Sequence, residues 1–401
     1  MDDNIALSTG AFNKRKSLLP DQTINNVTFH GDAGDYFSLW LKNIIFCILT
    51  LGIYLPWAMV NRRRYFMNAT EINHTRFEYH AKPTEILFGF ILTGVSLLLI
   101  PVLTSVSPTL GLLMMLVVII LIPYALIRLW HFNVRNTSFR EHRFAYQCNY
   151  MRLYLVVLIL PVLLLVVTMV CSVMFSQWYV KVSTGPAVDN VFGLMMMTSI
   201  IPLIGLFIIW SVQGKQLCEL LVNNLSYNKT VFSLSLLYKR LMLISLITVL
   251  LLSPFVAAGF SQLSDLTFLM MIPEEVWTAS LRTMVIIKIS LFYLLFFCGA
   301  MTAGIYFRVS CWTYVINSMT LGNLRFRCNM TYLSYLFLIL SNFLLIICTL
   351  GFGSAYADIR HARYLARHIW IVGDMDSISD INKSEIQADR SRYDNVVVSV
   401  D

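Results

Sequence analysis

Residues 109–127, TLGLLMMLVVIILIPYALI, form a run of nineteen residues without a charge. A helix that crosses the hydrocarbon core of a bilayer needs about 20 such residues. In the whole chain 57% of the residues are hydrophobic and only 13% are charged, against about 25% in ordinary globular domains. The run therefore predicts a membrane-spanning helix, and the composition predicts that lipid surrounds most of the chain.

Other apolar stretches lie on both sides of this run, and the chain between residues 28 and 372 is the predicted integral membrane domain. In order, the stretches are Tyr36–Val60, Ile86–Thr104, Thr109–Trp130, Leu153–Phe175, Val191–Val212, Leu241–Phe260, Met284–Phe307 and Tyr332–Ala357. The polar residues 1–27 and the polar, acidic residues 373–401 are expected to be mobile tails. Residues 1–35 lack the apolar run of a cleavable signal peptide.

Lysine and arginine are concentrated in every second connection between these stretches. Sixteen of them lie in 61–84, 131–152, 213–240 and 308–331, whereas the alternate connections hold two. Because positively charged loops stay in the cytoplasm, the basic connections are predicted to face inward in a plasma membrane. The same rule accounts for the formal net charge of +8, so membrane lipids are the expected partner and nucleic acid is excluded.

The first and last apolar stretches share a sequence pattern. Tyr36–Tyr65 aligns without a gap with Tyr335–Tyr364, and eleven of thirty positions are identical. If each stretch crossed the membrane once, the arginines that follow the last stretch would face outward, against the charge rule. We therefore expect both stretches to be interrupted, at Thr50–Gly52 and Thr349–Gly351, and to re-enter the cytoplasmic side, because glycine tolerates the turn. Eight plain spans with both tails outside are the alternative.

A second pattern places phenylalanine between polar residues in the basic connections. Arg76–Tyr79 (RFEY) matches Arg143–Tyr146 (RFAY), and weaker copies occur at 28–31, 230–232 and 325–328. Such alternation is typical of short extended segments. The predicted fold is therefore an all-α membrane protein. It is a polytopic helical bundle of six full spans, flanked by two interrupted terminal segments, with short cytoplasmic extended elements.

The string Thr50–Ala58 (TLGIYLPWA), followed by Arg64-Tyr65 and a Phe-x-Tyr element, carries a resemblance to a known family. It resembles the YjgN family of bacterial inner-membrane proteins, which is defined by a domain of unknown function. The resemblance covers residues 28–370, and the second copy departs from the string at Gly353–Tyr356. It implies a bacterial inner membrane and brings no catalytic residues.

Two sets of residues are candidates for binding. The polar and glycine positions that recur in the two terminal segments are candidates for a substrate site, with helix capping as the structural alternative: Asn43, Thr50, Gly52, Asn342, Thr349 and Gly351. The arginines that follow those segments are candidates for anionic lipid headgroups, although membrane orientation alone would also require them: Arg62, Arg63, Arg64, Arg360 and Arg363.

No pattern in the chain predicts catalysis, a metal site or a cofactor. The eight cysteines form no CxxC pair and the seven histidines form no HExxH string, so both are expected to be structural. The prolines inside the spans suit a transporter or channel for a small or lipidic solute, because kinked helices expose carbonyls, with ordinary kinks of spanning helices as the structural alternative. A non-transporting membrane scaffold or assembly partner is the alternative. The substrate, protein partners and oligomeric state are left open.

Overall fold

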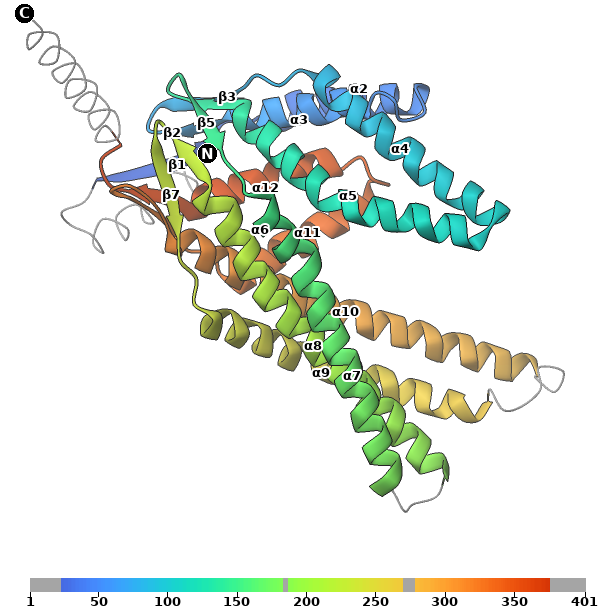
Figure 1. The fold of residues 1–401 in the computed structure, drawn as a ribbon. Helices are drawn as coiled ribbons and strands as arrows, with labels where there is room; N and C mark the ends of the chain where they lie inside the picture. The colour runs from blue at the N-terminus through green and yellow to red at the C-terminus, as the bar shows by residue number, and fades with distance from the viewer. Residues whose placement is uncertain (1–22, 183–186, 270–277, 376–401) are drawn as a thin grey trace, which may run out of the picture.

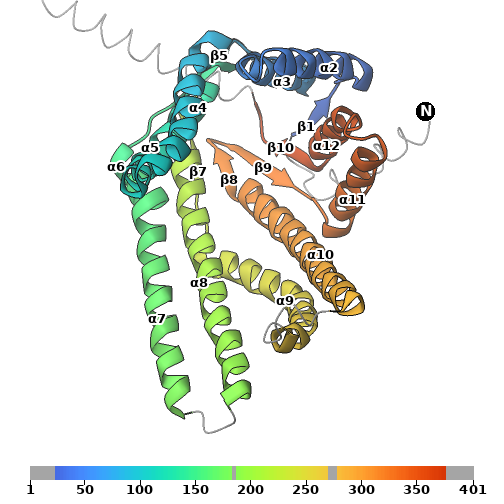
Figure 2. The same cartoon turned by 90° about the vertical axis from the view of Figure 1, so that its right-hand side faces the viewer.

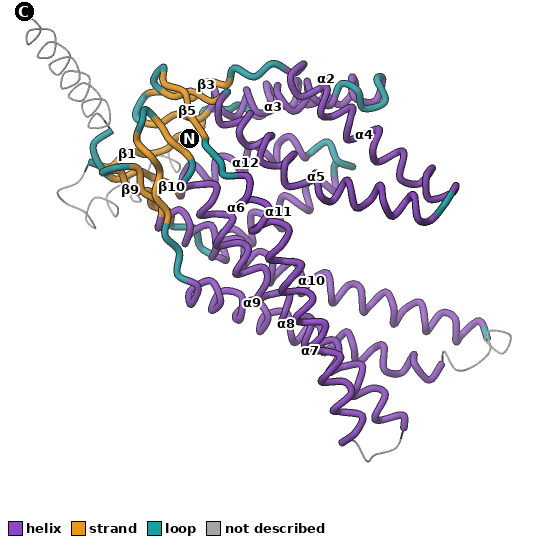
Figure 3. Tube along the Cα trace, viewed as in Figure 1, coloured by secondary structure: helices purple, strands orange, loops and turns teal. Residues whose placement is uncertain are grey.

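In the computed structural model, which describes residues 23–182, 187–269 and 278–375, short strands gather at one end of long helices (Figures 1 and 3). Ten strands in these residues form a closed antiparallel barrel in the order β1-β10-β9-β8-β7-β6-β5-β4-β3-β2, with β2 paired to β1. The strands are β1 (Ile24–Phe29), β2 (Thr70–Ile72), β3 (Thr75–Tyr79), β4 (Thr137–Phe139), β5 (His142–Tyr146), β6 (Leu225–Tyr227), β7 (Thr230–Leu234), β8 (Met319–Leu321), β9 (Leu324–Cys328) and β10 (Ile369–Val372).

Two kinds of connection alternate around the barrel. Tight turns join β2 to β3, β4 to β5, β6 to β7 and β8 to β9. In the first of these, Asn73 and His74 both have positive φ, as the two central residues of a type I′ hairpin turn require. The other connections are helical hairpins: α2 (Ala33–Leu49) with α3 (Leu55–Ala69), α4 (Pro83–Val106) with α5 (Pro108–Arg135), α7 (Leu160–Val182) with α8 (Ala187–Asn223), α9 (Tyr238–Leu269) with α10 (Ala279–Ser318), and α11 (Tyr332–Cys348) with α12 (Ser354–His368).

The barrel interior is filled by apolar side chains, which include six aromatic residues. The last residue of each three-residue strand and the middle residue of each five-residue strand point into the same cluster, as the period of two along a strand allows. The cluster contains Val27, Ile72, Phe77, Phe139, Phe144, Tyr227, Phe232, Leu321, Leu324, Phe326 and Ile371. Burial of each large side chain contributes about 1.5–3 kcal/mol, so the apolar cluster stabilises the barrel.

The helical hairpins diverge from the barrel in different directions, as Figure 2 shows. Within each hairpin the two helices are in contact, and α8 also packs on α9. Proline at the first turn of α4 and of α5 suits a helix start, because the missing N–H has no helical partner there. Before α7, α6 (Tyr150–Tyr154) continues through a π-helical turn at Leu155–Ile159. Pro161 lies two residues after this turn and lacks the N–H that a regular helix donates to the carbonyl four residues back.

Five helices in the described residues are long and apolar enough to cross a membrane: Pro83–Val106, Pro108–Arg135, Tyr150–Tyr179, Tyr238–Gly259 and Ala279–Ser318. The predicted span Val191–Val212 falls in α8, where the side chains of residues 187–200 lie outside the described part. The predicted tails lie mostly outside it as well. β1 begins at Ile24, so the expected domain boundary at residue 28 falls inside a strand.

The prediction of an all-α bundle with six full spans is wrong. The chain is a mixed helix and strand protein, with a ten-stranded barrel and five candidate spans in the described residues. The Phe-x-Tyr pattern correctly indicated extended segments, but pairing between segments far apart in the chain left no local signal. The helices do not form one compact bundle either. The hairpins diverge from the barrel (Figure 2), and neighbouring hairpins touch where α8 meets α9 and α10 meets α11.

Candidate functional site

The first and last hairpins turn at the positions where the sequence predicts interruptions. In the first, the Thr50 hydroxyl donates to the Phe46 carbonyl (2.7 Å) and accepts from the Tyr54 amide (3.0 Å). In the last, the Thr349 hydroxyl donates to the Leu345 carbonyl (2.6 Å) and accepts from the Gly353 amide (2.6 Å). Each threonine thus caps both helices of its hairpin, which uses its one O–H donor and one of its two acceptor positions.

The glycines beside these threonines are needed for their backbone conformation. Gly52 has φ +91° and Gly351 has φ +97°, a region that other L-residues rarely adopt. The preceding residues, Leu51 and Leu350, also have positive φ and are 95% and 91% exposed. The four candidate substrate residues at the turns therefore lie at hairpin tips, where the exposed side chains are those of the two leucines.

The two candidate asparagines are buried inside separate hairpins. The Asn43 side-chain oxygen accepts a hydrogen bond from Asn61 across α2 and α3 (3.4 Å). The Asn342 amide nitrogen donates to the Ala357 carbonyl (3.4 Å), while its side-chain oxygen has no partner. Each asparagine lies seven residues before the threonine of its own turn and bonds within its own hairpin.

The five candidate arginines contact groups of the chain itself. Arg64 donates to the carbonyls of Tyr79 and Ala81, and Arg363 donates to the carbonyl of Gly31 (2.8 Å). These carbonyls lie at and just beyond the ends of β3 and β1, so both arginines fasten a helix end to the barrel. The other three contacts are Arg62 with Asp358, Arg63 with the Tyr79 ring and Arg360 with the Ser341 hydroxyl.

A polar cluster lies where the two ends of the described chain meet. Arg62 of α3 forms an ion pair with Asp358 of α12 (3.1 Å), and the Tyr36 hydroxyl donates to the same carboxylate (3.1 Å). We call Tyr36, Arg62 and Asp358 the closure triad. Tyr36 is almost fully buried, so this contact joins α2, α3 and α12 through a satisfied polar network.

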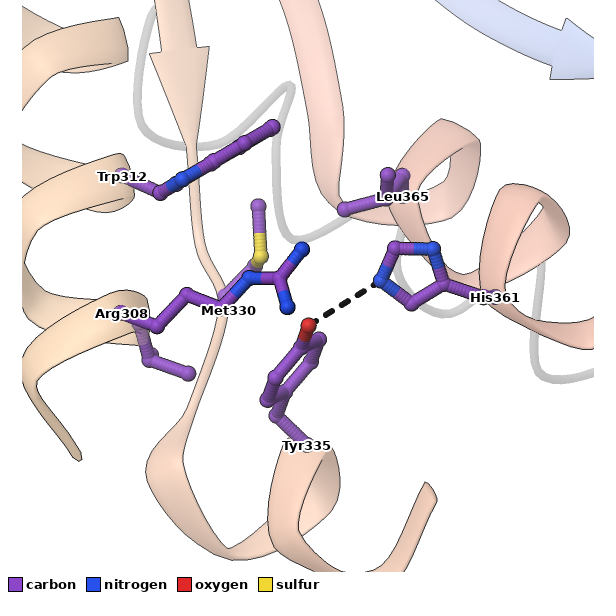
Figure 4. A pocket seen from close by; sticks show the side chains of 7 residues that line it. Arg308, Trp312, Met330, Tyr335, His361 and Leu365 are labelled. Carbon is purple, nitrogen blue, oxygen red and sulfur yellow. Dashed lines mark hydrogen bonds between the residues drawn. The ribbon is translucent and has the colours of Figure 1, made fainter. Parts of the chain in front are cut away.

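A second polar cluster lies between α10, α11 and α12, and Figure 4 shows it from close by. A hydrogen bond of 3.0 Å joins the Tyr335 hydroxyl and His361 Nε2. Arg308 of α10 points into the same pocket, with its guanidinium 5.9 Å from the centre of the Trp312 ring. We call Arg308, Tyr335 and His361 the pocket triad. Burial and the nearby positive charge of Arg308 lower the pKa of His361 below its ordinary value.

Sequence reasoning missed both triads. Tyr36 and Tyr335, and likewise Arg62 and His361, occupy equivalent positions in the alignment of 36–65 with 335–364. That alignment was available, but the third member of each triad comes from a different helix. Asp358 and Arg308 each lie eleven residues before the first residue of the following strand, Ile369 and Met319. The equivalence is visible only once the strands are known.

A larger cavity of about 520 Å³ opens beside α2, α3 and β3. It is lined by charged groups of both signs, including Asp32, Asp35, Arg64 and Arg76. Asp32 is also the N-cap of α2, because its carboxylate accepts from the amides of Asp35 (3.2 Å) and Gly34 (2.7 Å), and these bonds lower its pKa. Asp32, Arg64 and Arg76 are thus engaged by other groups of the chain.

These features define a class of protein: a multi-pass helical membrane protein with a strand barrel at one end of its helices. The chain belongs to the family described as bacterial protein of unknown function (DUF898), which matches residues 25–392. This result confirms the family that the Thr50–Ala58 string indicated.

The relatives are bacterial inner-membrane proteins. The chain is 27% identical over 372 residues to the inner membrane protein YjgN of Salmonella typhimurium, covering 90% of this chain and 92% of that protein. It is 23% identical over 389 residues to the inner membrane protein YjgN of Escherichia coli K12, covering 91% and 93%. No solved structure matches. With its apolar helices, the chain is an inner-membrane protein, as predicted.

Proposed function

We propose that the protein is a non-transporting membrane scaffold. In this proposal the barrel holds the helical hairpins apart, so that their apolar flanks pack on other membrane proteins. The protein has no catalytic step. The observation that carries the proposal is the contrast between a filled barrel and sparsely packed spans. The barrel interior is an apolar cluster, whereas α4 has no buried residue at all.

The lack of buried charge supports a scaffold over a transporter. The buried polar residues in the described part of the chain are asparagine, serine and threonine, with no Asp, Glu, Lys or Arg among them. Ion and proton pathways through a membrane depend on such ionisable groups. A solute that moved along the barrel axis would also have to displace the aromatic cluster.

The proposal includes the internal repeat that the sequence suggests at its two ends. Each unit would consist of a strand, a helical hairpin and a second strand. Three residues at equivalent positions, each shortly before one strand, support this idea. Each contacts the segment just after a strand that pairs with that strand. Arg64 donates to the Ala81 carbonyl, Glu219 accepts from the Leu236 amide, and Arg363 donates to the Gly31 carbonyl.

A transporter for a small or lipidic solute remains the second candidate. One observation favours it, the hydroxyl pair that Ser211 of α8 and Ser245 of α9 form in the membrane region, with Thr248 buried one turn away. Hydroxyls inside a helical pair can line a polar path. They also join helices without any path, and Thr248 donates to the Ile244 carbonyl of its own helix.

Site-specific photocrosslinking in native membranes tests the scaffold. A photoreactive amino acid would replace Leu98 of α4 or Ile286 of α10, which are 72% and 64% exposed. We expect discrete protein adducts larger than the monomer. The matched control is Ile244, which is buried among the chain's own helices, and which should give none. Lipid adducts alone at both outward positions would contradict the proposal.

A further inference from the structure

The two triads have the same arrangement of positions, but the residue before the strand is negatively charged in one and positively charged in the other. Each joins a residue eleven positions before a strand, a tyrosine near the start of the next hairpin, and a residue on the second helix of that hairpin. In the closure triad the first position is an acid, Asp358, which neutralises Arg62. In the pocket triad the first position is Arg308 and the last is His361.

The pocket triad therefore lacks an anion where its counterpart has one. Among the ion pairs of the described residues, none includes Arg308. Asp358 lies one turn before His361 on α12, but its carboxylate is held by Arg62 and Tyr36. A guanidinium, an imidazole and a phenol thus converge without a carboxylate from the chain. Tyr335 and His361 bond each other, so the exposed Arg308 guanidinium is the group of this triad that can bind an anion from outside the chain.

The pocket itself is small. Its volume is about 10 Å³ and it is lined by the triad with Val309, Trp312, Met330 and Leu365, which is room for about one water molecule. An anion would therefore lie at the mouth of the pocket. Figure 4 shows the Arg308 guanidinium between Trp312 on one side and Tyr335 with His361 on the other. The Arg308 side chain is exposed, so an anion can reach it from outside.

The pocket also lies at the depth of lipid headgroups. Arg308 is the first charged residue of α10 after Lys288, at the end of an apolar stretch of nineteen residues. Trp312 follows one turn later and is 44% exposed, and tryptophan is enriched at the membrane–water interface. The barrel lies beyond the end of this helix, on the side that the basic connections assign to the cytoplasm.

We propose that Arg308, Tyr335, His361 and Trp312 form a phosphate-binding site that holds the headgroup of an anionic phospholipid of the cytoplasmic leaflet. The Arg308 guanidinium donates two hydrogen bonds to the phosphate oxygens. The Tyr335 hydroxyl and His361 complete the shell, and Trp312 packs along the glycerol region. The phosphate takes the place that the Asp358 carboxylate holds in the closure triad.

Native mass spectrometry of the full chain in detergent tests the site, with phosphatidylglycerol, phosphatidylcholine and inorganic phosphate as probes. Phosphatidylglycerol should bind and phosphatidylcholine should not. Arg308→Gln should weaken phosphatidylglycerol binding about tenfold, the effect expected for one charge-assisted contact. Arg308→Asp, which supplies the missing carboxylate from the chain, should abolish binding.

The matched control is Arg325→Gln, which removes the same charge from the exposed wall of β9. Equal losses in Arg308→Gln and Arg325→Gln would mean unspecific attraction and overturn the proposal. Displacement of phosphatidylglycerol by millimolar phosphate would support recognition of the phosphate itself. If the protein binds phosphate but does not bind phosphatidylglycerol, the site takes a soluble anion, and the proposal of a lipid ligand is wrong. Arg308→Lys should fold and keep part of the affinity, so a folding defect in the other variants is recognised by comparison.

Discussion

The barrel and the membrane hairpins are packed to very different densities. Side chains from all ten strands meet in one interior, whereas α4 contributes no buried residue to any contact. Apolar burial therefore stabilises the barrel in water, while the hairpins depend on lipid or on partners to cover their flanks. The difference teaches that the barrel sets where each hairpin starts and ends, and that the hairpins are packed mainly where they join the barrel.

A substitution of phenylalanine in each region gives the largest expected contrast. Phe232→Ala in the barrel should lower the free energy of unfolding by about 3–5 kcal/mol, because it opens a cavity in a packed core. Phe88→Ala in α4, where Phe88 is 77% exposed, should change it by less than about 0.5 kcal/mol. Thermal unfolding in detergent measures both, and equal losses would contradict the comparison.

The hairpin tips should show an intermediate effect. Gly351→Ala places a side chain at φ +97° with no atom within 4 Å of its Cβ, so the cost is conformational strain of about 1–2 kcal/mol. Gly89→Ala in α4 meets the same open space without positive φ, and there alanine should stabilise the helix by up to about 1 kcal/mol. The two variants should therefore shift the unfolding temperature in opposite directions. A loss of similar size in both would rule out backbone strain as the cause.

The smallest expected effect is a dependence on pH at the pocket triad. Because burial and Arg308 lower the pKa of His361, the unfolded chain takes up the proton first as the pH falls. Stability should then decline below the ordinary histidine pKa of about 6.5. Arg308→Gln removes one of the two causes and should lessen the decline, and His361→Gln should remove it. Unfolding temperatures between pH 8 and pH 5 provide the measurement, and an unchanged decline in His361→Gln would place its origin elsewhere.

The sequence was sufficient for the features that depend on local patterns. Uncharged runs such as Thr109–Ile127 revealed membrane helices, and Thr50–Gly52 marked a helix break, because both signals lie within a few residues. The Phe-x-Tyr elements revealed extended segments. Their closure into a barrel depends on pairs such as Phe29 with Thr70, which lie a whole hairpin apart, so composition alone led to an all-α assignment.

The candidate sites were harder to predict from the sequence, because their residues also come from parts of the chain that lie far apart. The repeated polar residues Thr50 and Thr349 drew attention as a substrate site, yet their hydroxyls are occupied in capping. Arg308 was counted only among the charges of a basic connection. Its relation to Tyr335 and His361 arises because α10 packs beside α11, a contact between helices that no spacing within one helix can indicate.

The pairing of β1 with both β2 and β10 has a consequence for biogenesis. During synthesis, nine strands can pair with their neighbours as they emerge, but the ring stays open until residues 369–372 have left the ribosome. An unfinished or misinserted chain would therefore expose two unpaired strand edges to the cytoplasm, where they invite pairing with another chain. Ring closure thus requires the last strand of the barrel to be present, because β10 lies between β9 and β1.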